Sequence, residues 1–144
     1  MSASPRPDSC EFCAGPGGAV LWQGPACRVV AVDDPDYPGF VRVILGRHAR
    51  EMADLDRRER DALMDVVFAV EAVVREAMQP HKMNLASLGN MTPHVHWHVI
   101  PRYRDDRHFP HPVWSAPQRS AAVPEDRRSR AAELGPAIAA RLAS

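Results

Sequence analysis

The sequence predicts an α+β domain in which an antiparallel sheet packs against one main helix and a shorter C-terminal helix. Three strand-like segments precede the only long helical segment and two follow it, an order that favours an antiparallel sheet covered on one face. The length of 144 residues, with 45% hydrophobic and 25% charged residues, suits one globular domain. We therefore expect a single domain over 1–144, with a flexible tail at 1–9 and a C-terminal extension at 115–144.

Five segments have the composition of short strands and are bounded by turn residues. They are 20–22, 27–32, 40–45, 83–88 and 94–102. Gly24-Pro25 separates the first two, Gly46 follows the third, and Gly89-Asn90 lies between the last two. The sequence thus predicts a five-stranded sheet.

The main helix has clear start and stop signals. Asp56 and Glu59 stand three positions apart, as in a capping box, and Pro80 ends the segment. Apolar residues recur at helical spacing between these signals: Leu63, Val67, Val70 and Val74. A shorter helix is expected to begin near Pro124 and to be interrupted at 135–136.

Composition argues against several classes of protein. Lys plus Arg and Asp plus Glu both number 18, so no global charge favours nucleic acid or an acidic membrane. Residues 1–8 lack the apolar centre of a signal peptide, and the apolar run 62–78 carries four charged residues. No phosphate-binding loop of the nucleotide-kinase form is present. Three cysteines make a poor disulfide framework, so we expect a cytoplasmic protein.

The fifth strand carries three alternating histidines. Side chains alternate along a strand, so His94, His96 and His98 are expected on one face, about 6.5–7 Å apart. The apolar residues between them, Val95, Trp97 and Val99, can then pack under the helix. Three aligned imidazoles in an apolar core would each need a hydrogen-bond partner, so the pattern indicates a functional site and not a core.

Two kinds of chemistry fit such a row of imidazoles. Imidazole is a common metal ligand, and one of the three could join a metal ion with ligands from elsewhere. His94 and His98 would lie about 13 Å apart, too far to bind one ion together. The other rings would then be available for nucleophilic attack at phosphorus, which neutral imidazole performs well near pH 7.

The histidine run resembles the signature of the histidine-triad (HIT) superfamily. His94 to Ile100, followed by Pro101-Arg102-Tyr103, matches that signature at every histidine. Other parts of the chain resemble bacterial members of the superfamily: Cys10-x-x-Cys13, Gly46-Arg47-His48, Asn84 and Gly89-Asn90. The resemblance implies a five-stranded antiparallel sheet with two helices, and a homodimer.

The resemblance also implies an activity at the α-phosphate of a nucleotide joined to a phosphate, an amine or a similar leaving group. His96 would be the catalytic nucleophile, His98 would donate to the phosphate or the leaving group, and His94 would flank them. Uridylyl-transferase relatives carry Gln where this chain has His98, so we expect hydrolysis of phosphoramidates, dinucleoside polyphosphates or similar conjugates. The chemistry needs no cofactor.

Further roles follow from the resemblance. Asn90, where many members have Gln, and Asn84 would contact the phosphate, and Asp33 would bind the ribose hydroxyls. The metal ligands would be Cys10, Cys13, His48 and His94, which form a Cys2His2 set for a structural zinc ion.

Other interpretations stay open. Asp33 also fits a solvated turn, and the charged segment 102–107 is expected to be a surface loop. Trp114 could close over the site or cover a neighbouring protomer. A regulatory nucleotide-binding protein with little turnover and a metal-dependent hydrolase that uses the strand histidines are the alternative functions.

Overall fold

The computed structural model describes residues 9–143 and contains one five-stranded antiparallel sheet. Residues 1–8 of the predicted tail lie outside the described residues. The strands run in the spatial order β1-β2-β3-β5-β4. Their bounds are β1 (Ala19–Gln23), β2 (Cys27–Ala31), β3 (Val41–Leu45), β4 (Lys82–Ala86) and β5 (His96–Arg102). Each predicted strand is therefore present, with ends that differ by up to two residues.

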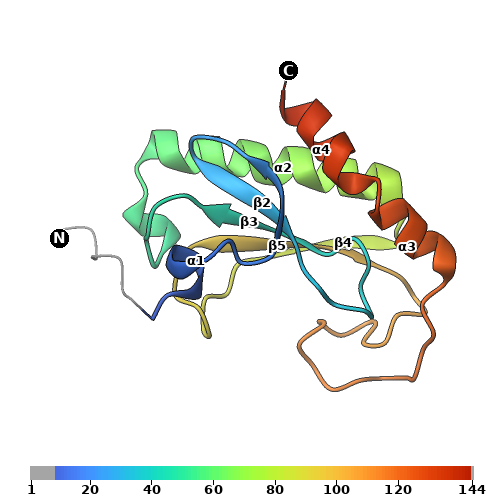
Figure 1. The fold of residues 1–144 in the computed structure, drawn as a ribbon. Helices are drawn as coiled ribbons and strands as arrows, with labels where there is room; N and C mark the ends of the chain where they lie inside the picture. Colours follow the sequence, from blue (N-terminus) through green and yellow to red (C-terminus); the bar gives the residue numbers. More distant parts are fainter. Residues whose placement is uncertain (1–8, 144) are drawn as a thin grey trace.

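The helices lie on both sides of this sheet. Three of them cover one face: α2 (Arg57–Met78), α3 (Glu125–Ala131) and α4 (Leu134–Leu142). The one-turn helix α1 (Glu11–Ala14) lies on the opposite face, as does the loop after β5 (Figure 1). No described helix is both long enough and apolar enough to cross a bilayer.

Helix α2 has the ends that the sequence predicts. The Asp56 carboxylate accepts a hydrogen bond from the Glu59 backbone N–H at 2.9 Å, and the Glu59 carboxylate accepts one from the Asp56 N–H at 3.1 Å. Gln79 then adopts a left-handed conformation with φ of 50°, and Pro80 follows. These contacts satisfy exposed helix-end groups and fix the length of α2.

The main core lies between α2 and the sheet. Val67 and Val70 of α2 are fully buried and belong to the same apolar cluster as Val43 of β3 and Val99 of β5. Trp97 packs against this cluster from the same side of β5. Burial of such side chains stabilises the fold by about 1.5–3 kcal/mol each. The alternation predicted for the fifth strand is confirmed on this face.

Two predicted details differ from the structure. The C-terminal helix breaks at Ala132-Glu133, and residues 135–136 lie in the first turn of α4. The backbone N–H groups in the first turn of a helix have no acceptor within that helix. A proline there loses no hydrogen bond, so Pro136 is compatible with α4. Strand β5 begins at His96, so His94 precedes the strand and is free to turn elsewhere.

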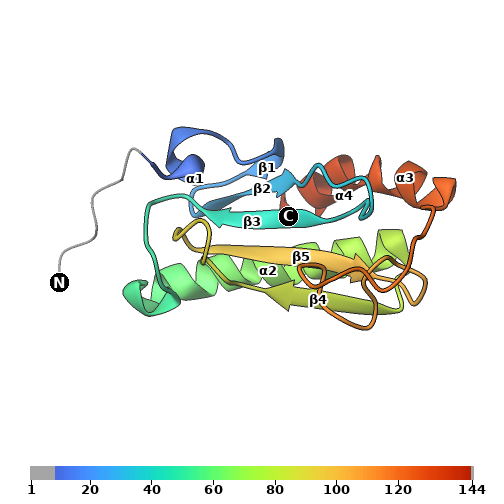
Figure 2. The ribbon, with the colours of Figure 1, turned by 90° about the horizontal axis from the view of Figure 1, so that it is seen from below.

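Figure 2 shows the sheet from the side opposite α2. His96 and His98 lie on this face, which we call the triad face, because their strand partners are not those that pack against α2. Directly paired residues of antiparallel strands share a face. His98 pairs with Arg42 of β3, His96 pairs with Ile44, and Asn84 of β4 pairs with Ile100. Two small apolar clusters also belong to this face: Cys10, Phe12, Val30 and Ile44 in one, and Tyr37, Phe40 and Ile100 in the other.

Candidate functional site

His96 is held in one orientation and one tautomer. Its Nδ1 lies 2.6 Å from the backbone carbonyl oxygen of His94. A carbonyl oxygen can only accept, so Nδ1 carries the proton and donates it. The lone pair of the ring is therefore on Nε2. This is the nitrogen that a nucleophilic imidazole needs.

The surroundings of His96 favour the neutral ring. Burial lowers its pKa, and the positive charge of Arg42 acts in the same direction, while the bond to the His94 carbonyl and the charge of Glu11 oppose them. The ring of Phe12 packs edge-on against it with ring centroids 4.9 Å apart. A buried, neutral imidazole at pH 7 keeps its lone pair available for attack.

His98 lies beside His96 on the triad face. The two ring centroids are 4.8 Å apart, and Trp114 covers His98 from the loop after β5 at the same distance. Burial lowers the pKa of His98 to about 3, with further contributions from His96 and Arg42. Its Nδ1 is buried and has no hydrogen-bond partner among residues 9–143. The neutral ring thus retains hydrogen-bonding capacity that the described residues do not use.

His94 turns away from its two neighbours and joins the predicted metal ligands. Its Nδ1 lies 3.4 Å from Cys10 Sγ, 3.5 Å from Cys13 Sγ and 3.2 Å from His48 Nδ1. Cys13 Sγ lies 3.4 Å from His48 Nδ1. All four ligand atoms fall within 4.8 Å of one another. The structure therefore brings together every residue of the Cys2His2 set.

These distances fit a tetrahedral zinc ion. Bonds of about 2.3 Å to sulfur and 2.0 Å to nitrogen place neighbouring ligand atoms about 3.3–3.8 Å apart. The His94 Nε2 donates to the Leu45 carbonyl oxygen at 2.8 Å, which leaves the Nδ1 lone pair facing the other three ligands. A backbone acceptor behind a ligating imidazole is the usual support of a zinc site. A zinc ion bound by all four side chains would have no open coordination position.

The three predicted substrate-binding residues differ in their surroundings. Asn84 lies on the triad face, and its side-chain oxygen accepts a hydrogen bond from Arg102 at 2.8 Å. This bond directs the amide NH2 group of Asn84 away from Arg102. Asn90 and Asp33 are exposed loop residues after β4 and β2 respectively. Only Asn84 thus has a fixed position beside the triad.

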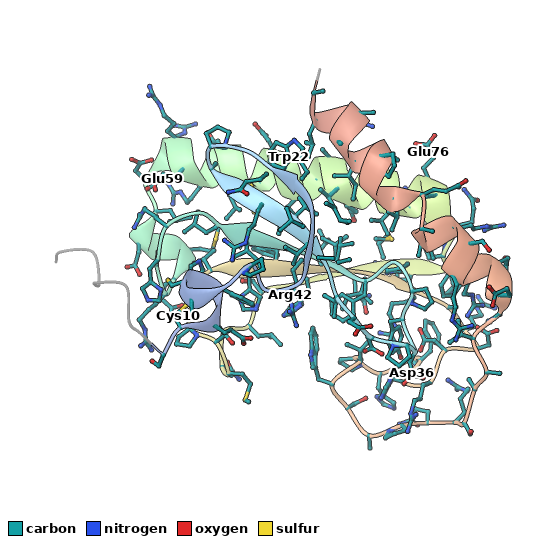
Figure 3. The ribbon with its side chains drawn as sticks, in the orientation of Figure 1. Cys10, Trp22, Asp36, Arg42, Glu59 and Glu76 are labelled. Carbon is teal, nitrogen blue, oxygen red and sulfur yellow. The ribbon has the colours of Figure 1, made fainter. Side chains whose placement is uncertain are left out.

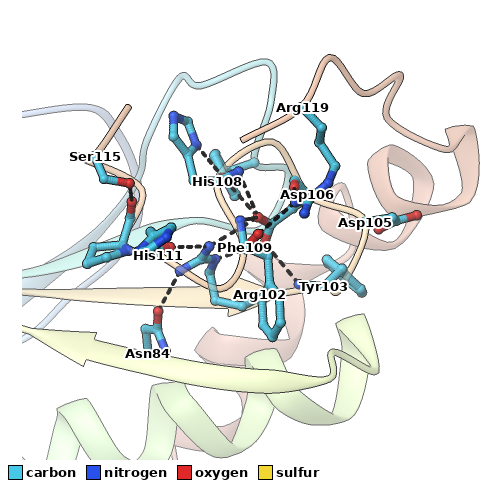
Figure 4. Close-up of polar contacts among 12 residues, drawn as sticks. Asn84, Arg102, Tyr103, Asp105, Asp106, His108, Phe109, His111, Ser115 and Arg119 are labelled. Carbon is cyan, nitrogen blue, oxygen red and sulfur yellow. Dashed lines mark hydrogen bonds and ion pairs between the residues drawn. The ribbon is translucent and has the colours of Figure 1, made fainter. Parts of the chain in front are cut away.

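The charged segment after β5 is not the simple surface loop that the sequence predicts. Arg102 and Asp106 are both buried, and their side chains form two hydrogen bonds of 2.8 and 3.1 Å (Figure 4). Arg102 also donates to the His111 carbonyl oxygen. Asp106 accepts bonds from the backbone N–H groups of His108 and Phe109. The pair fixes the loop that carries Trp114, because it joins the end of β5 to the loop.

Two residues beside the triad have no predicted role, Arg42 and Phe12, whereas Trp114 lies against His98, the first of the two places considered for it. A guanidinium in the apolar run of the third strand is the signal that points to Arg42, because an arginine there requires a partner. A pocket of about 470 Å³ also borders His94 and His96, between the loops 50–53 and 87–89.

Comparison with known proteins agrees with this geometry. The family model described as "HIT domain" matches residues 18–105, which is more than half of the chain. The chain belongs to the HIT domain family. The matched region of this HIT protein contains all five strands, α2 and the three histidines.

Individual HIT relatives support the same assignment. A protein of Mycobacterium tuberculosis named AP-4-A phosphorylase is 29% identical over 98 residues, which are 64% of this chain and 50% of that protein. The chain thus spans about half the length of the curated relatives it matches.

Solved structures share the fold over nearly the whole chain. A histidine triad protein from Bradyrhizobium japonicum is 27% identical with a TM-score of 0.74, and the match covers 90% of this chain and 97% of the other. A Zn-bound histidine triad family protein from Mycobacterium smegmatis is 20% identical with a TM-score of 0.66, over 94% and 96% of the two chains. The predicted five-stranded sheet with a main and a C-terminal helix is confirmed.

Proposed function

We propose that this HIT protein hydrolyses nucleotide conjugates at the α-phosphate through a covalent nucleotidyl intermediate on His96. The observation that carries the proposal is the bond from His96 Nδ1 to the His94 carbonyl, which leaves the Nε2 lone pair for attack. In the first step a bond forms between Nε2 and phosphorus, and the bond to the leaving group breaks. In the second step a water oxygen attacks phosphorus and the P–N bond breaks, its electron pair returning to Nε2. The nucleoside monophosphate leaves and the water proton passes to solvent.

The neighbouring groups have roles that fit their positions. The neutral ring of His98 donates a hydrogen bond to a phosphoryl oxygen or to the leaving-group atom, which takes its proton from solvent, and the partnerless Nδ1 supports this role. Asn84 and Asn90 donate hydrogen bonds from their side-chain NH2 groups to phosphoryl oxygens, where charge develops in the transition state. Asp33 binds the ribose hydroxyls, and its exposed position at the end of β2 leaves its carboxylate open to them.

The substrates we propose are nucleoside phosphoramidates, dinucleoside polyphosphates or similar conjugates. The relative named AP-4-A phosphorylase supports a dinucleoside polyphosphate and raises a second acceptor, inorganic phosphate in place of water. The two acceptors give different products, a nucleoside monophosphate and a nucleoside diphosphate. Assays with and without added phosphate separate them.

The test of the proposal is the kinetic effect of His96→Gly. We expect the variant to fold and to bind a nucleoside monophosphate but to lose turnover by several orders of magnitude, because the P–N bond cannot form. His81→Gly, at an exposed histidine, is the matched control and keeps wild-type turnover. A His96→Gly enzyme with near-wild-type rates on every conjugate would contradict the proposal.

We also propose that Cys10, Cys13, His48 and His94 hold a structural zinc ion. The converging ligand distances support it, and the Zn-bound neighbour from Mycobacterium smegmatis is compatible with it. The ion would supply a crosslink between the N-terminal segment and the sheet. Loss of activity on removal of metal with the fold retained would instead favour a metal-dependent hydrolase.

The proposed assembly is a homodimer in the cytoplasm. Strand β4 lies at an edge of the sheet, and Phe68 of α2 is about half exposed. An open strand edge and an exposed aromatic side chain are features that a second copy can cover. The cysteines form no disulfide with one another among residues 9–143, which suits a reducing cytoplasm.

A further inference from the structure

Arg42 places a cation on the triad face beside the reactive histidines. Its position in β3 is directly opposite His98, and Ile44, two residues on, is opposite His96. Figure 3 shows the Arg42 side chain on the side of the sheet opposite α2, near α1. The positive charge is close enough to His96 and His98 to lower the pKa of both rings.

The guanidinium of Arg42 has unused hydrogen-bonding capacity. Its Nε is buried without a partner among residues 9–143, and one contact of 3.4 Å joins Nη1 to the Gly17 carbonyl oxygen. Arg28 of β2 lies on the same face and provides a comparison. It donates to three backbone carbonyl oxygens at 2.8, 2.8 and 3.1 Å. The fold therefore uses the donors of Arg28 in three bonds, whereas Arg42 makes one long contact and keeps donors available.

No carboxylate among the described residues forms an ion pair with Arg42. Burial lowers the pKa of Arg42, and the charge of Glu11 opposes this shift. The Glu11 carboxylate itself accepts a hydrogen bond from Thr92. The guanidinium also lies over the ring of Phe12, at 5.6 Å from its centroid. A partly buried cation without a close counter-ion favours the entry of an anion.

We infer that Arg42 is a substrate-binding residue that donates hydrogen bonds to a phosphate group of the nucleotide held at His96. The inference deepens the proposed function and rests on it. The N–H groups of a guanidinium match the oxygens of a phosphate in geometry. Arg42 lies on the triad face together with His96, the proposed nucleophile. The phosphate we assign to it is the one transferred to His96, which is also the one present in a nucleoside monophosphate.

The test compares the binding of adenosine 5′-monophosphate and adenosine by calorimetry. In wild type the monophosphate binds more tightly than the nucleoside, and Arg42→Gln weakens monophosphate binding about 10- to 100-fold while adenosine affinity stays unchanged. Arg42→Lys keeps the charge and retains part of the affinity. Arg60→Gln removes an exposed arginine of α2 and is the matched charge control, with wild-type affinity for both ligands.

The two sources of phosphate give different kinetics. If Arg42 binds the transferred phosphate, Arg42→Gln lowers kcat/KM equally for a phosphoramidate with an amine leaving group and for a dinucleoside polyphosphate. A loss confined to the polyphosphate would place Arg42 at the leaving group instead and would overturn the inference. Equal losses for monophosphate and adenosine, or no loss for either, would overturn the inference. A wild-type chain that does not bind the monophosphate would also overturn it. The proposed function is tested separately, because a nucleotide adduct on His96 would support it even if Arg42 has no role.

Discussion

At the scale of single residues, His94 connects the two parts of the site. Its ring nitrogen Nδ1 faces the side chains of Cys10, Cys13 and His48, while its backbone carbonyl accepts a hydrogen bond from Nδ1 of His96. The same residue therefore contributes to the Cys2His2 cluster and sets the tautomer of the proposed nucleophile. This double use explains why the first histidine of the run leaves the strand and the other two stay on it.

His98 is expected to make the stability of the protein depend on pH. Its pKa in the fold is about 3, and its unfolded value is about 6.5. Between these values the unfolded chain binds more protons than the fold, so the free energy of unfolding falls as the pH is lowered from 6.5 towards 3. One such imidazole contributes up to about 1.4 kcal/mol per pH unit.

Urea unfolding at pH 7.5 and 4.5, with a chelator present throughout, measures this effect. The loss of stability between the two pH values should be smaller in His98→Gln than in wild type, since glutamine does not titrate. His81→Gln, which changes an exposed histidine, serves as the control and keeps the wild-type loss. Equal losses in wild type and His98→Gln would show that the burial of this ring does not disfavour its protonation.

At the scale of elements, the loop after β5 depends on Asp106. This carboxylate accepts hydrogen bonds from Arg102 and from the backbone N–H groups of Tyr103, His108 and Phe109. Although burial opposes ionisation, the bond from Arg102 and the other bonds lower the pKa of Asp106 to about 2. The loop that places a tryptophan on the triad is thus organised by one buried acid.

Replacement of Asp106 by alanine should destabilise the protein by about 3–5 kcal/mol, because it leaves the buried Arg102 guanidinium without its counter-ion. Asp105→Ala is the matched control, since Asp105 is exposed and pairs with Arg127 at the surface. It should cost less than about 1 kcal/mol. Urea unfolding measures both values, and similar costs for the two substitutions would contradict this role of the buried pair.

We expect the metal cluster to anchor helix α1, because Cys10 directly precedes this helix and Cys13 lies in it. Cys13→Ser should lower the zinc content of the purified protein from about one ion per chain to near zero and lower the thermal midpoint. Cys27→Ala is the control, because Cys27 lies in the core and is outside the cluster. A Cys13→Ser protein that retains its metal would contradict the ligand assignment, as would a wild-type protein without any.

At the scale of the whole molecule, regular patterns were predictable and long-range pairings were not. The capping box at Asp56 and the alternation along β5 depend on neighbours in sequence, and both predictions are confirmed. Arg102 is buried because the loop brings Asp106 and the His111 carbonyl oxygen to its guanidinium. The polar composition of segment 102–107 does not contain this information, so the sequence predicted a surface loop. Arg42 meets His98 only through strand pairing, which a single sequence does not specify.

The central claim is that His96 forms a covalent bond to the nucleotide. The most direct test is mass spectrometry of the intact protein quenched in acid-free denaturant during turnover of a dinucleoside polyphosphate, followed by peptide mapping. The account predicts a transient mass increase of one nucleotidyl group, located on His96 and absent from His96→Gly. Rapid turnover with no adduct at any time point, or with the adduct on another residue, would contradict it.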